Sequence, residues 1–135
     1  MINEELAHLY LKTIVYFEED GKMIPASESS VATTSKIHVI TAWNPGDDRP
    51  NRKVNGEANE RLRQKLRQRG CRPVRAIGAD PDSDHLEESW AVTGLDDGEA
   101  RAIGAEFGQV AIFRIAAGIQ TVLACTAYFE LSRPL

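Results

Sequence analysis

Apolar and polar residues alternate along several short segments of the chain, and turn residues separate these segments. Alternation with a period of two is typical of half-buried β-strands, whereas apolar residues three or four apart are typical of helices. The pattern predicts two helices, over 55–69 and 96–107, and six strands, over 11–18, 37–43, 73–78, 88–94, 109–115 and 119–128. The segment 25–35 is rich in Ser, Thr and Ala, and we expect it to form an exposed, mobile loop.

This order of elements, β-β-α-β-β-α-β-β, predicts an α+β fold. We expect a mixed, mainly antiparallel sheet with two helices packed on one face. The chain has 135 residues, of which 42% are hydrophobic and 27% charged, as in an average soluble domain. A single globular domain over residues 1–135 is therefore expected, with a core that needs no metal or disulfide.

The first predicted helix carries two asparagines on its apolar side. At 100° per residue, Asn55, Asn59, Leu62 and Leu66 lie within about 60° of one another. The leucines must pack on the sheet, because basic residues occupy the other sides of the helix. The asparagines therefore point inward, where an unpaired amide costs about 1–3 kcal/mol. Their expected partners are the backbone of the 44–56 loop or a ligand held by that loop.

The 44–56 loop joins the end of a central strand to the start of a helix. Open α/β sheets bind ligands at such strand ends, and the free N–H groups of a helix start attract anions. Three basic residues add positive charge there: Arg49, Arg52 and Lys53. The loop is neither a Walker loop nor a dinucleotide-binding glycine motif. With Thr41 and Asn44 it predicts a polar pocket for an anionic small molecule, such as a nucleotide or another phosphate compound.

Two further residues are candidates for this pocket. Glu88 shares a strand face with Trp90 and Val92, so it is either a general base at the edge of the core or an exposed strand-end glutamate. Gln109 is either a second inward amide or a strand-end hydrogen bonder. The predicted ligand-binding residues are Thr41, Asn44, Asn55, Asn59, Glu88 and Gln109, and no catalytic residue is assigned.

Charge is divided unevenly along the chain, whose net charge is −4. Residues 49–75 contain ten basic and two acidic residues, a net charge of +8, and residues 80–106 contain nine acidic residues and one basic residue, a net charge of −8. Such asymmetry indicates an anionic partner, or two halves that neutralise each other within a chain or across a dimer.

Several functional classes lack their signature motifs. Cys71 and Cys125 are too few for a disulfide framework and match no zinc or redox spacing, so they are expected to be free thiols. The aspartates that begin at Asp80 lack the glycine and glutamate of an EF-hand, and the histidines are scattered. No metal and no cofactor are expected. The sequence contains neither a membrane-spanning run nor a signal peptide, which predicts a cytoplasmic protein.

With these residues in view, the chain resembles a family of small bacterial proteins that is catalogued only as a domain of unknown function. The resemblance covers about Ile37 to Cys125. It rests on Thr41-Ala42-Trp43-Asn44-Pro45, Asn55 with Asn59, Gly78-x-Asp80-Pro81, Glu87-Glu88-Ser89 and Phe107-Gly108-Gln109. The resemblance implies the fold unit and the positions of the site, and it supplies no reaction.

Three functions from different classes remain open. The favoured one is a small-ligand binding domain that uses the pocket above. The second is a hydrolytic enzyme with Glu88 as its base, so whether the protein is an enzyme stays undecided. The third is a nucleic-acid or protein interaction module that uses the basic helix face, although the acidic remainder would repel nucleic acid. A homodimer through an edge strand of the C-terminal hairpin is compatible with each of them.

Overall fold

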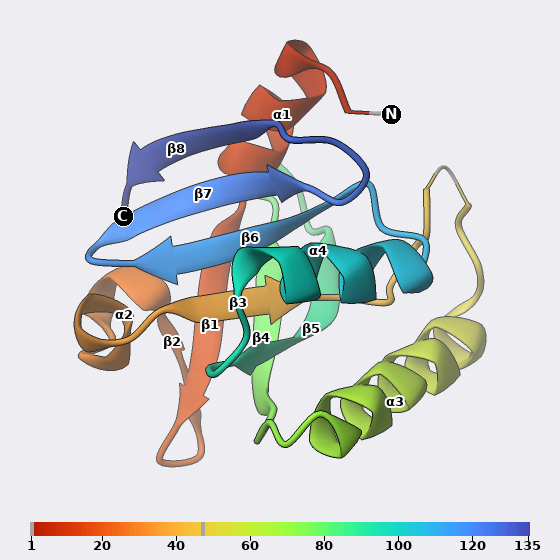
Figure 1. The fold of residues 1–135 in the computed structure, drawn as a ribbon, viewed down its shortest axis with the longest axis horizontal. Helices are drawn as coiled ribbons and strands as arrows, with labels where there is room; N and C mark the ends of the chain where they lie inside the picture. Colours follow the sequence, from red (N-terminus) through yellow and green to blue (C-terminus); the bar gives the residue numbers. More distant parts are fainter. Residues whose placement is uncertain (1, 47) are drawn as a thin grey trace.

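The computed structural model describes residues 2–46 and 48–135, which form one eight-stranded sheet and four α-helices (Figure 1). The helices are α1 (Glu4–Leu11), α2 (Val31–Thr34), α3 (Arg52–Gln68) and α4 (Asp97–Glu106). The strands are β1 (Ile14–Glu19), β2 (Lys22–Pro25), β3 (Ile37–Ile40), β4 (Val74–Ala79), β5 (Leu86–Val92), β6 (Ala111–Ala116), β7 (Ile119–Ala124) and β8 (Glu130–Pro134).

The strand order is β2-β1-β4-β5-β3-β6-β7-β8, and every described strand pair is antiparallel. The prediction of an α+β fold is confirmed, but the prediction of a mixed sheet is wrong. The helical connection through α3 does join two parallel strands, β3 and β4. However, β5 lies between them and pairs antiparallel with both. In the same way β3 separates β5 from β6, which α4 connects.

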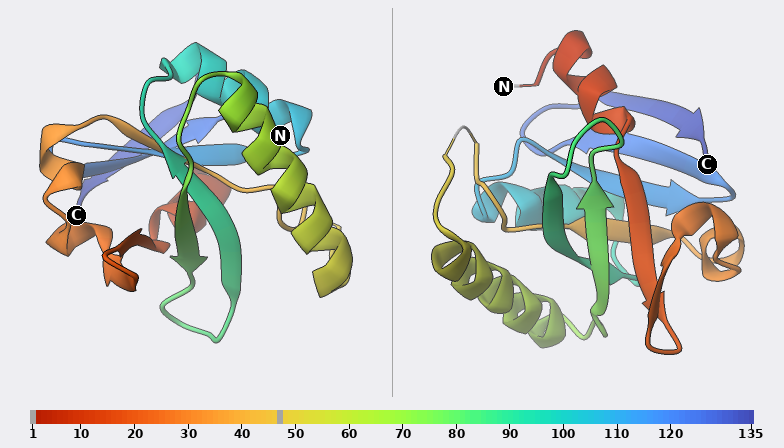
Figure 2. Two further views of the ribbon diagram at one scale, coloured as in Figure 1. Left: turned by 90° about the horizontal axis from the view of Figure 1, so that it is seen from below. Right: turned by 180° about the vertical axis from the view of Figure 1, so that it is seen from behind.

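The sheet curls, so that its C-terminal strands approach the junction between α1 and β1 (Figure 2). Arg133 on β8 donates hydrogen bonds to the backbone oxygens of Leu11, at 2.6 Å, and Thr13, at 3.1 Å. The Gln120 amide on β7 donates to the same Thr13 oxygen at 3.0 Å. Strands that lie far apart in the sheet are thereby joined through one backbone segment.

The sequence pattern missed four elements: α1, α2, β2 and β8. The predicted first strand began at Leu11, but Leu11 ends α1, whose start is capped where the Asn3 side chain accepts a hydrogen bond from the Leu6 N–H. The expected mobile loop 25–35 contains α2 and a single 3₁₀ turn, and it buries Ala26 and Ala32 in a hydrophobic cluster. These elements are short, so their periodicity was too brief to detect.

The two faces of the sheet carry different helices. On one face, which we call the α3 face, Leu62 and Leu66 of α3 pack in one cluster with Ile40 and Val92 of the sheet. Ile103 of α4 belongs to the same cluster. On the opposite face, which we call the α1 face, the alternate residues of the same strands pack against α1, α2 and the segment between β2 and α2. Residues next to one another on a strand therefore lie in different environments.

Local signals explain the ends of the two longer helices. The Asn51 side chain accepts a hydrogen bond from the Val54 N–H, so α3 begins at Arg52 rather than at Asn55. Asp96 and Glu99 form a capping box at the start of α4, with reciprocal hydrogen bonds of 2.7 and 3.2 Å. Strand β3 ends at Ile40, three residues before the predicted end, and the freed segment leads into the site.

Candidate functional site

The two asparagines of α3 point into the molecule, as their position beside the leucines predicted. Asn55 is 3% exposed and Asn59 is 6% exposed. The Asn59 Oδ1 accepts a hydrogen bond from the Ala42 N–H at 3.3 Å, and the Asn55 Oδ1 accepts from the Asn44 N–H at 3.0 Å. The Asn55 amide also donates to the Asn44 Oδ1 at 2.9 Å. The expected partners of these amides were the loop backbone or a ligand, and in the structure they bond to the loop.

The segment after β3 is held from three sides. The Thr41 hydroxyl donates to the Glu88 backbone oxygen at 2.6 Å and accepts from the Trp43 N–H at 3.0 Å. The Gln109 amide donates to the Trp43 oxygen at 3.2 Å. Asn44 has a φ of +47°, a left-handed conformation that an asparagine adopts more readily than most residues. Hydrogen bonds from α3, β5 and Gln109 therefore hold residues 41–44 in place.

A cavity of about 420 Å³ opens on the α1 face, beside this loop. Its floor includes Gly78 on β4, Glu87 and Ser89 on β5, Val39 on β3 and Phe113 on β6. On α1, Leu6, Leu9 and Tyr10 form one wall. Gly78 and Ser89 have small side chains and fill little of the space between the strands and α1.

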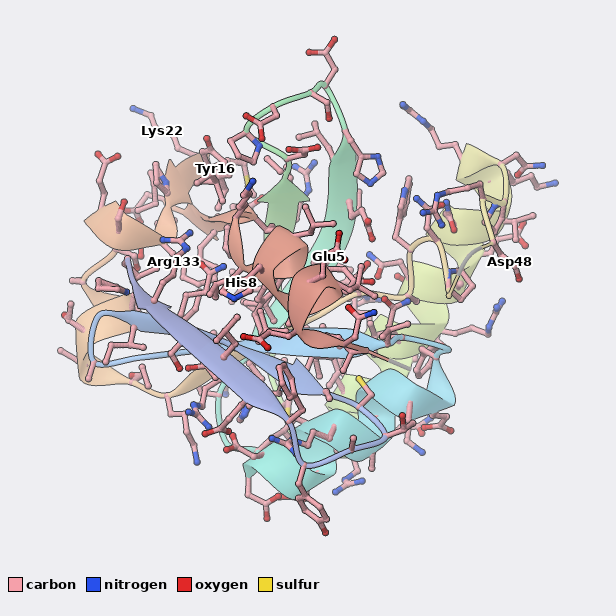
Figure 3. The ribbon with its side chains drawn as sticks, turned by 90° about the horizontal axis from the view of Figure 1, so that it is seen from above. Glu5, His8, Tyr16, Lys22, Asp48 and Arg133 are labelled. Atoms are coloured by element: carbon pink, nitrogen blue, oxygen red, sulfur yellow. The ribbon has the colours of Figure 1, made fainter. Side chains whose placement is uncertain are left out.

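Two loops complete the rim of the cavity. One supplies Asn44, Gly46 and Arg49, and the other is the turn between β4 and β5, from Asp80 to His85. Figure 3 views the molecule from the α1 side, with Glu5 and His8 on the helix and Asp48 on the loop that precedes α3. The cavity is therefore bounded by segments that are distant in sequence.

The structure brings together only part of the predicted site. Thr41, Asn44 and Gln109 line the cavity, whereas Asn55 and Asn59 lie behind the loop and hold it in place. Glu88 points to the α3 face. There its carboxylate forms an ion pair with Arg75, at 3.1 Å, with its side chain 38% exposed.

Glu87, the residue before Glu88, lies on the α1 face and lines the cavity. Its Oε2 is 3.0 Å from the Nε2 of His85, and its side chain is 28% exposed. The sequence contained a signal for this placement. Trp90 and Val92 occupy the core of the α3 face, so Glu88 must share their side and Glu87 must face the other way with Ser89.

Charges of both signs line the cavity. The acidic residues are Asp80, Asp82 and Glu87, and the cations are Lys12 and Arg49. The pKa of Asp80 is lowered because its carboxylate accepts hydrogen bonds from the Asp82 N–H and from the Ser83 hydroxyl. Arg49 donates to the Gly46 and Asp48 backbone oxygens, so its guanidinium is partly engaged by its own loop.

Metal-binding clusters and membrane-spanning helices are two other features that bear on function. No group of three or more His, Cys, Asp or Glu in residues 2–46 and 48–135 is placed to hold a metal ion. Within the same residues no helix combines the length and the apolar character needed to cross a bilayer.

Fold and cavity together define a class: an α+β domain with an antiparallel curled sheet and a helix-walled cavity at the end of a central strand. The chain belongs to the family described as protein of unknown function (DUF3293), whose model matches residues 40–112. The match includes the cavity residues from Thr41 to Ile112 and excludes α1. No curated protein and no solved structure matches the chain.

Proposed function

We propose that this protein binds a small molecule in the cavity on the α1 face. The observation that carries the proposal is the convergence of separate sequence motifs on one cavity of about 420 Å³, within the range typical of ligand sites. The motifs that carried the family resemblance supply wall residues from the strand end, the β4–β5 turn, β5 and the start of β6: Thr41, Asn44, Gly78, Asp80, Pro81, Glu87, Ser89 and Gln109.

The composition of the wall supports an amphipathic ligand that carries a positive charge. Leu6, Tyr10 and Phe113 offer apolar surface to the body of such a molecule. Three carboxylates line the cavity against two cations, one of which is held by its own loop. This balance favours an amine over the phosphate compound suggested by the sequence. Glu87 is the residue that we assign to the charged group, because it rises from the floor beside Ser89.

Thermal shift with a library of small amines and phosphate esters tests the proposal. An amine at about 100 times its Kd should stabilise the wild-type protein by about 2.7 kcal/mol. Glu87→Gln should abolish this shift, and the matched control Glu88→Gln should retain it, because Glu88 lies on the other face. Shifts given only by phosphate esters would contradict the ligand class. A shift lost in Glu88→Gln and kept in Glu87→Gln would contradict the site.

A second candidate function, hydrolysis, is favoured by the contact between Glu87 and His85. A carboxylate within 3.0 Å of an imidazole, beside a cavity, has the geometry of a general base and the group that orients it. In this version the base is Glu87 instead of Glu88. Hydrolysis predicts that Glu87→Gln still binds a neutral substrate and no longer turns it over, whereas simple amine binding predicts that the same variant loses affinity.

Cellular location and oligomeric state are also open to direct tests. Cys71 and Cys125 are both free thiols, which fits the proposed cytoplasmic location in a bacterial cell, and cell fractionation tests it. Strand β8 lies at the edge of the sheet, where a second copy could pair, and size-exclusion chromatography with light scattering tests the proposed homodimer.

A further inference from the structure

Ion pairs divide the basic residues of α3 into two groups. On the side of α3 nearest α4, Lys65 lies 3.5 Å from Glu106 and Arg69 lies 2.5 Å from Glu99. Arg63 is neutralised by Glu60, one turn earlier on the same helix, at 2.8 Å. These ion pairs form because α3 and α4 pack against the same hydrophobic cluster. They neutralise part of the positive charge of residues 49–75 with part of the negative charge of residues 80–106.

The second group consists of Arg52, Lys53, Arg61 and Arg67, which at 100° per residue are spread over about half of the helix circumference and which we call the basic face of α3. All four side chains are exposed, and none forms an ion pair or a hydrogen bond within residues 2–46 and 48–135. Of the two glutamates on α3, Glu60 pairs with Arg63, and Glu57 forms no ion pair within the described residues. Among the described residues, the helix thus presents four unpaired cations and one unpaired carboxylate to solvent, on a protein whose net charge is −4.

We propose that the basic face of α3 binds the phosphate backbone of a nucleic acid. Arg52 and Arg67 are fifteen residues apart, which corresponds to about 22 Å along a helix and spans several phosphates of a strand. Three of the four cations are arginines, whose planar guanidinium donates two parallel hydrogen bonds to phosphate oxygens. Figure 2 shows α3 along one margin of the molecule, with its outer side turned away from the sheet.

The surroundings of the basic face favour nucleic acid over a membrane or a protein. A helix that lies on a bilayer needs a free apolar side, but Leu62 and Leu66 are fully buried against the sheet. A protein interface needs an apolar centre. Among the residues of α3 that the structure describes, Val54 is the large hydrophobic residue that is exposed, at 46%, and a single valine does not form such a centre. A surface rich in arginine and poor in apolar side chains is typical of phosphate contact.

The test is fluorescence anisotropy with the full chain and two labelled probes, a single-stranded RNA and a DNA duplex. Four phosphate contacts on a single strand give a log–log salt slope of about −2.8, so affinity should fall roughly 50-fold between about 50 and 200 mM salt. Arg61→Gln with Arg67→Gln should halve this slope and weaken binding at low salt. The matched control, Lys65→Gln with Arg69→Gln, removes the same amount of charge from the ion-paired group. It should bind the probes more tightly than the variant that carries Arg61→Gln and Arg67→Gln.

Each result supports or overturns the proposal, and none depends on the cavity. Binding to either probe with the predicted salt slope and the predicted ranking of variants supports it, and the two probes show which strand form is preferred. Absence of binding to both probes at low salt overturns it, as does equal weakening by the two double variants. An acidic polypeptide that competes as well as unlabelled RNA also overturns the choice of nucleic acid. Circular dichroism of each variant confirms that α3 is retained.

Discussion

The two faces of the sheet use the same strands but differ in how completely they are filled. On the α3 face, Leu62, Leu66 and Ile103 pack directly on the strands, and the Cys125 thiol is buried deeply enough to raise its pKa to about 12. A Cβ added to Gly104 would lie 2.7 Å from the Cys125 Sγ. On the α1 face, a cavity of about 420 Å³ remains between the strands and α1.

The difference follows from side-chain size at neighbouring positions of the strands. Residues that face α3 are large, such as Ile40, Trp90 and Val92, whereas Ser89 and Gly78 on the other side are small. Packing to the density of a protein interior is reached only where side chains fill the space between layers. Both faces contribute to the hydrophobic core, and the α1 face also leaves a cavity beside its small residues.

The largest effect is expected from shortening a leucine on the filled face. Leu66→Ala removes a fully buried side chain and leaves a cavity, so the free energy of unfolding should fall by about 2–5 kcal/mol. Leu6→Ala on α1 should cost only about 1 kcal/mol, because Leu6 already borders open space. Urea denaturation of both variants measures the comparison. Equal losses would show that the α1 face is as tightly packed as the other.

A smaller effect is expected from removing an amide that supports the loop. Asn59→Ala leaves the Ala42 N–H without its partner in a buried site and should lower the free energy of unfolding by about 1–3 kcal/mol. Gln109→Ala removes a donor at the cavity wall, where water can replace it, and should cost less than about 1 kcal/mol. Urea titrations of the two variants decide the order, and a larger loss for Gln109→Ala would contradict it.

The smallest of these effects concerns pH and the buried His38 on the α3 face. Burial lowers the pKa of His38 below its ordinary value, although the hydrogen bond of 2.7 Å to Asp97 opposes this shift. Burial alone would raise the pKa of Asp97, but His38 and Arg114 outweigh it and lower the pKa. Both groups therefore contribute stability that is present at neutral pH and lost on acidification.

For His38, the loss begins as the pH falls through the ordinary histidine pKa of about 6.5, and it is complete below the lowered value in the folded state. The Nδ1 of His38 is buried and has no hydrogen-bond partner among the described residues, so its protonation would leave a buried N–H without an acceptor even though Nε2 contacts Asp97. Unfolding measured at about pH 7.5 and 5.5 should show a smaller change for His38→Gln than for the wild type. Equal changes would exclude His38 as the source.

Sequence patterns located the principal elements and the inward side of α3, because both depend on local periodicity. Asn55 and Asn59 could be placed from their spacing to Leu62 and Leu66 alone. Glu87 could have been placed in the same way, since strand alternation puts it opposite Glu88. The elements α1 and β8 could not be recognised, because each is short and is stabilised by distant contacts, such as that of Arg133 with Leu11.

The amino-acid order by itself determined the class of fold, the capped helices, the buried asparagines and the uneven distribution of charge. These features follow from interactions between residues a few positions apart, whose geometry is the same in any helix or strand. Tertiary structure alone decided that the sheet is fully antiparallel, that α1 forms a cavity wall, and which of the basic residues on α3 are neutralised. Each of these depends on contacts between segments distant in sequence, and local periodicity carries no information about such contacts.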